Sequence, residues 1–120
     1  MFVQKRDYGA FLQTVRVNVG KEVGLADDED AYIVLRELPT LEMMELRDAY
    51  SKGQKELLEF FREVLPKIIV EHNFYETDEK KMTNDALSSL VFERMDLSGK
   101  VIGEYSSASF FTRGRKTEGQ

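Results

Sequence analysis

Apolar residues recur at helical spacing through the middle of the chain. They are separated by three, four or seven positions, which places them on one face of a helix: Met43, Leu46, Tyr50, Leu57, Phe61 and Val64. Thr40 suits the N-cap, because its hydroxyl can accept a hydrogen bond from a free amide of the first turn. The pattern predicts one long central helix of about 24 residues, roughly 36 Å in length. Gly53 interrupts it at a cost of about 1 kcal/mol, as a bend or a weak point.

Two segments before this helix have strand-like patterns. Residues 31–35 are rich in β-branched and aromatic side chains and lie between a run of acids and Pro39, so they are predicted to form a strand. Residues 8–19 begin with helical spacing and end with the alternation of a strand. A short N-terminal helix followed by an edge strand at 15–19 is the favoured interpretation.

The second half of the chain is also expected to be mainly helical. Pro66 should kink or end the long helix, and residues 67–72 are read as either a further helical turn or a short strand. Thr83 or Asn84 is expected to cap the next helix. The buried face of that helix is marked by Leu87, Leu90, Val91 and Met95.

The elements predicted for the last part of the chain complete the predicted fold. Ser98 and Gly99 are expected to close the preceding helix, and the apolar content of residues 101–111 favours a last helix. Residues 1–111 are therefore predicted to be one helix-rich α+β domain with a small antiparallel sheet. Residues 112–120 are predicted to be a disordered basic tail.

The composition agrees with one globular domain inside a cell. The chain has 120 residues, of which 42% are hydrophobic and 32% charged, a balance typical of folded proteins. It contains no cysteine, which excludes disulfides and thiolate chemistry and fits a reducing compartment. Its apolar runs are far shorter than the ~20 residues that span a bilayer. The cytoplasm is the expected location.

Charge is unevenly distributed along the sequence. The net charge of −5 argues against general binding of nucleic acid, which requires Lys and Arg to neutralise phosphates. Residues 21–48 hold nine acidic and three basic residues, whereas 112–120 hold three basic residues and one acid. This asymmetry fits a solvated acidic loop and a frayed basic end, or electrostatic steering between copies or onto a partner.

The residues that usually carry catalysis are scarce. His72 is the only histidine, whereas zinc sites normally draw on several His or Cys ligands. The acids of residues 27–30 are consecutive and lack the alternating spacing of a calcium loop. We therefore expect no enzymatic activity, no cofactor and no metal site.

Apolar surface remains as the candidate for function. Leu58, Phe60 and Leu65 lie off the main stripe of the long helix, so its second half is apolar on more than one side. Such a helix either occupies the centre of the fold or meets a partner. The residues we expect to bind protein lie on this helix and near the end of the chain: Tyr50, Leu57, Phe60, Phe61, Tyr105, Phe110 and Phe111.

Several segments together are similar to a known family. The predicted strand and the helix start read Tyr32-Ile33-Val34-Leu35-Arg36-Glu37-Leu38 and Pro39-Thr40-Leu41-Glu42. A later segment reads Ile68-Ile69-Val70-Glu71-His72-Asn73-Phe74-Tyr75 and precedes the helix at 83–95 and the closing segment at 101–111. Over residues 30–111 the chain resembles the tail assembly chaperones of long-tailed bacteriophages and prophages.

The resemblance implies a function in the cytoplasm of a bacterial host. Such a protein binds the tape measure protein, shields its apolar helices from aggregation and helps to recruit the tail tube protein. Self-association into a homo-oligomer is also expected. Two alternatives remain open: a structural head–tail connector or tail completion protein that stays in the particle, and a small regulator that binds nucleic acid through the basic tail.

Overall fold

A three-stranded antiparallel sheet and four helices make up the fold in a computed structural model, which describes residues 13–25 and 30–108. The strands are β1 (Thr14–Asn18), β2 (Tyr32–Arg36) and β3 (Ile69–His72). The helices are α1 (Thr40–Lys52), α2 (Gln54–Ile68), α3 (Asn84–Glu93) and α4 (Met95–Ser107). The predicted α+β class with a small antiparallel sheet is confirmed.

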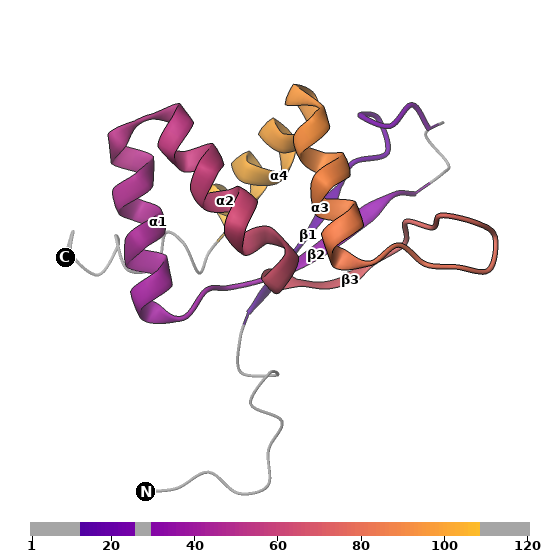
Figure 1. The fold of residues 1–120 in the computed structure, drawn as a ribbon, viewed down its shortest axis with the longest axis horizontal. Helices are drawn as coiled ribbons and strands as arrows, with labels where there is room; N and C mark the ends of the chain where they lie inside the picture. The colour runs from indigo at the N-terminus through magenta and orange to yellow at the C-terminus, as the bar shows by residue number, and fades with distance from the viewer. Residues whose placement is uncertain (1–12, 26–29, 109–120) are drawn as a thin grey trace, which may run out of the picture.

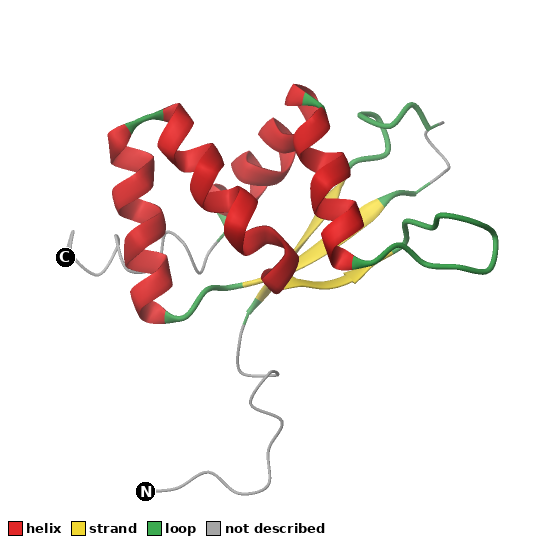
Figure 2. Ribbon diagram, in the orientation of Figure 1, coloured by secondary structure: helices red, strands yellow, loops and turns green. Residues whose placement is uncertain are grey.

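The helices form one layer and the sheet forms the other (Figure 1; Figure 2). The strand order is β1-β2-β3, with Val17 opposite Ile33 and Val34 opposite Glu71. The register shifts between Val34 and Leu35, where the second pairing is irregular. β1 lies at an edge of this sheet, close to the residues 15–19 predicted for an edge strand.

The alternation of side chains along β2 explains the two layers. Successive residues of a strand point to opposite faces of the sheet. Ile33 and Leu35 are fully buried beneath the helices, whereas Tyr32, Val34 and Arg36 are only half-buried. The apolar face of the sheet therefore lies against the helical layer.

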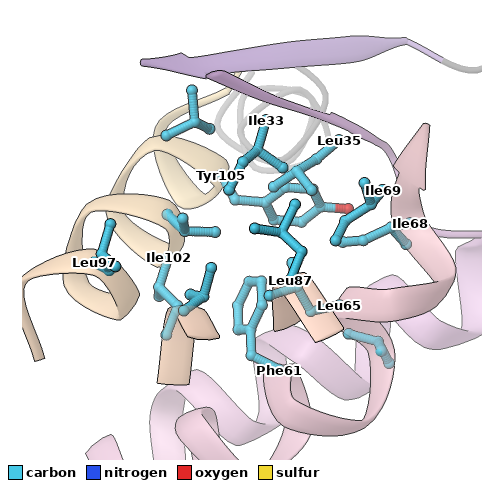
Figure 3. Packing of buried hydrophobic residues seen from close by; sticks show 14 of the residues in the cluster. Ile33, Leu35, Phe61, Leu65, Ile68, Ile69, Leu87, Leu97, Ile102 and Tyr105 are labelled. Atoms are coloured by element: carbon cyan, nitrogen blue, oxygen red, sulfur yellow. The ribbon is translucent and has the colours of Figure 1, made fainter. Parts of the chain in front are cut away.

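The core joins the sheet to α2, α3 and α4 (Figure 3). The rings of Phe61 and Tyr105 meet edge to face with their centroids 5.5 Å apart. The Tyr105 hydroxyl donates a hydrogen bond to the carbonyl oxygen of Arg36 at 3.0 Å, and burial raises the pKa of Tyr105 above its ordinary value. This contact ties α4 to the end of β2.

The prediction of one long central helix is not confirmed. The chain leaves the helical conformation at Gly53, which has a φ of 132°, and the two helices on either side meet at a sharp turn (Figure 1). This φ is open to glycine but strained for other residues. Turning here brings Met43 and Leu46 of α1, together with Phe61 of α2, into one core.

We expect Gly53→Ala to lower the free energy of unfolding by about 1–3 kcal/mol, because it forces a side chain into a strained backbone region. Gly99→Ala is the matched control. Gly99 lies inside α4, and a Cβ added there meets nothing within 4 Å, so helix propensity should raise stability by about 1 kcal/mol. Urea denaturation measures both changes. Two changes of the same sign would contradict this account of the turn.

The helix starts follow the predictions only in part. Thr40 is not a cap, because α1 begins with Pro39 at the N-cap and has no side-chain capping bond. At α3 the Thr83 hydroxyl accepts a hydrogen bond from the amide of Ala86 at 3.1 Å, as predicted. The Asn84 side chain instead donates to the carbonyl oxygens of Pro66 and Ile69. Asn84 thus fastens the start of α3 to the end of α2.

Of two predicted helix ends, the one near Pro66 agrees in part and the one at Ser98 and Gly99 is wrong. α2 continues past Pro66 to Ile68, and β3 begins at the next residue, so residues 67–72 combine both alternatives. Ser98 and Gly99 lie inside α4, because the chain breaks earlier, at the extended residue Arg94. The Ser98 hydroxyl donates to the Arg94 carbonyl oxygen at 3.1 Å, which stabilises the first turn of the new helix.

Some predictions fall on residues outside the described ranges. The N-terminal helix was placed mostly within residues 1–12, and the basic tail within residues 112–120. The predicted last helix corresponds to the second half of α4, which ends at Ser107. Phe110 and Phe111 also lie outside the described ranges.

Candidate protein-binding groove

An apolar groove lies between the α1–α2 turn and α4, with a volume of about 530 Å³. We call it the α2–α4 groove. Large apolar side chains and small residues make up most of its lining: Tyr50, Leu57, Leu58, Met95, Ser98, Gly99, Ile102, Gly103 and Ser106. A groove of this size and character is typical of a binding site.

The large apolar residues form a floor and a rim. Leu57 and Ile102 lie at the floor and are almost fully buried. Tyr50 and Met95 lie at the rim, with 52% and 89% of their surfaces exposed. Exposed apolar side chains that gather in one concave place, rather than being scattered singly, indicate a contact surface.

Two glycines leave part of the α4 wall of the groove without side chains. Gly99 and Gly103 are one helical turn apart, and a Cβ added to either meets nothing within 4 Å. Each glycine inside a helix costs about 1 kcal/mol relative to alanine. Packing among the described residues does not require this cost. The two glycines instead leave room for another chain to approach the α4 backbone closely.

Ser106 adds a polar group to one end of the groove. Its hydroxyl oxygen is buried and has no hydrogen-bond partner among residues 13–25 and 30–108. Leaving such a group unsatisfied costs about 1–3 kcal/mol. A bound chain could meet this hydroxyl only after the Ser106 side chain rotated towards the groove.

The groove continues along α2 towards α3. A second hollow of about 840 Å³ shares Leu58, Glu59, Met95 and Ser98 with the first and extends to Phe92. The two hollows together follow much of one side of α2. A partner in extended contact with both would meet apolar residues from three helices.

The seven predicted binding residues are divided between the groove, a separate cleft, the core and the residues after 108, which the structure does not describe. Tyr50 and Leu57 line the groove. Phe61 and Tyr105 are wrong as surface residues, because both are fully buried against each other in the core. Phe60 is half-buried in a separate cleft between α1 and α2, among several carboxylates. Phe110 and Phe111 lie outside the described ranges.

The α4 side of the groove was not predicted. Met95 was assigned to the buried face of the preceding helix, and the two glycines of α4 were not read as a pair. Their spacing of four residues, with Ser106 three residues later, is the signal that could have marked this face. Leu58 lies off the main apolar stripe of the predicted long helix, but it is not among the residues predicted from the sequence to bind protein.

His72 has a structural role at the end of β3. It is buried, its Nδ1 accepts a hydrogen bond from the Phe74 amide at 3.0 Å, and its Nε2 lies 3.0 Å from the Met82 carbonyl oxygen. These partners suit a neutral ring that donates from Nε2. Burial lowers its pKa, and the nearby Lys81 cation lowers it further. Within the described ranges, no three His, Cys, Asp or Glu residues are placed to hold a metal ion.

Stability is expected to fall in mild acid because of His72. Its folded pKa lies below the ordinary value of 6.5, so the unfolded chain binds this proton more readily. The contribution is fully present above pH 6.5 and is lost as the pH falls towards the folded pKa. Urea denaturation over about pH 5 to 8 measures it. His72→Gln should flatten the curve in this range, and an unchanged pH dependence would contradict the assignment.

None of the helices in the described part of the chain has the length and apolar character needed to cross a bilayer. Comparison of the sequence and fold with protein-family models, curated proteins and solved structures finds no match.

Proposed function

We propose that this chain is a phage tail assembly chaperone that holds an apolar helical segment of the tape measure protein in the α2–α4 groove. The observation that carries this proposal is the groove itself, where exposed apolar residues flank a glycine-lined helix. The sequence resemblance supplies the identity of the client.

The groove has the features that a helical client needs. An amphipathic helix binds a groove through apolar residues spaced three and four apart on one face. Gly99 and Gly103 allow its backbone to approach α4, while Tyr50 and Met95 can cover its sides. The apolar face of the client would then leave water at this surface rather than in an aggregate.

The remaining surface suits a chaperone that must keep a client soluble. The net charge of −5 favours solubility and does not favour binding of nucleic acid. We include in the proposal self-association into a homo-oligomer, recruitment of the tail tube protein and action in the cytoplasm of the bacterial host.

Co-expression with a tape measure protein tests the proposal. We expect the two proteins to co-elute in size exclusion with light scattering, and the client to stay soluble. A soluble chain beside an aggregated client would contradict it. Mass spectrometry of purified virions should not detect the chain, whereas a head–tail connector or tail completion protein would remain in the particle.

A further inference from the structure

Helix α4 ends beside the groove. Ser106 lines one end of the groove, α4 ends at the next residue, and the backbone turns to an extended conformation at Ala108. Of the twelve residues that follow, Phe110 and Phe111 are the only aromatic ones, and Arg113 is the first charged one. Two large apolar side chains therefore follow the groove within a few residues.

We propose that residues 109–111 of the same chain dock in the α2–α4 groove and cover it when no client is bound. Three residues beyond Ala108 reach at most about 10 Å. Ile102 lies six residues before Ala108, about 9 Å along the helix axis. A chain that folds back after Ala108 can thus bring both phenyl rings to the apolar floor.

The groove has the features that this segment requires. Leu57 and Ile102 offer an apolar floor for the rings, and each phenylalanine has a large apolar surface to remove from water. Gly99 and Gly103 leave space beside the α4 backbone.

Docking of this segment has a consequence for the client, which rests on the proposed function. The client helix and residues 109–111 would compete for the same groove. The free protein would then conceal its own apolar surface, and the client would displace the segment on binding. Removing the segment should therefore tighten client binding.

A single tryptophan can report the docking, because the chain contains none. We expect Phe110→Trp in the full chain to emit at shorter wavelength than Thr117→Trp and to be quenched several-fold less by acrylamide. Adding Gly103→Leu should fill the groove and make the signal of the residue 110 probe match that of the residue 117 control. Gly99→Leu serves as a second groove variant, and circular dichroism verifies that both fold.

Three outcomes would overturn the docking proposal. One is an emission wavelength and an acrylamide quenching of Phe110→Trp that equal those of Thr117→Trp in the otherwise unchanged chain. Another is protection that Gly103→Leu and Gly99→Leu leave unchanged in folded protein. A third is protection lost on dilution, which would assign the segment to a neighbouring copy. If the probe is buried and released by both variants, but added tape measure protein does not displace it, docking stands and the proposed client site fails.

Discussion

Replacing Phe61 with alanine is expected to lower the free energy of unfolding by about 3–5 kcal/mol. The ring is fully buried and packs edge to face with Tyr105, so the substitution leaves a cavity at the junction of α2 and α4. The surrounding elements can close that cavity only in part. Urea denaturation followed by circular dichroism measures the change.

Phe60→Ala is the matched control for this prediction. Phe60 is the preceding residue on α2 but is only half-buried, in the cleft between α1 and α2. The same truncation there removes less buried area and leaves a site that water can enter, so its cost should be clearly smaller. Equal losses for the two variants would contradict the assignment of Phe61 to the core.

Gly103→Leu is expected to weaken client binding by about 30-fold or more, because a side chain placed in the groove excludes a residue of the client at the centre of the contact. The folded state should tolerate it, since a Cβ at this position meets nothing within 4 Å and leucine has a higher helix propensity than glycine. Titration with a soluble tape measure segment measures the affinity.

Ser107→Leu provides the control for groove filling. Ser107 is an exposed residue of the same helix that does not line the groove, so leucine there adds a similar apolar group at a different place. Client affinity should stay within a few-fold of the original. A loss equal to that of Gly103→Leu would show that added apolar surface, rather than the filled groove, causes the effect.

Local patterns predicted the elements whose formation depends on nearby residues. The β-branched and aromatic content around Ile33 was sufficient to predict β2. The polar side chains of Thr83 and Asn84 predicted the start of α3 without deciding which of them is the cap. The turn at Gly53 was harder, because a glycine costs a helix only about 1 kcal/mol and many helices tolerate one. Packing of α1 alongside α2, with residues of both helices in one core, decides that the chain turns there.

The candidate site depends on contacts between distant residues, which the sequence pattern does not reveal. Phe60 and Phe61 differ by about 100° around the helix, so one belongs to the core and the other does not. Which one is buried depends on where α4 lies, and Tyr105 of α4 is the residue that meets Phe61. The groove likewise joins Tyr50 to Gly103 and exists only once α4 packs beside α2.

Site-specific photo-crosslinking tests the central claim most directly. A photoreactive residue would replace Met95, which is 89% exposed at the groove rim, or Met44, which is 57% exposed on α1 and does not line the α2–α4 groove. With tape measure protein co-expressed, the account predicts crosslinks from position 95 and none from position 44. A complex that forms and crosslinks from position 44 but not from position 95 would contradict it.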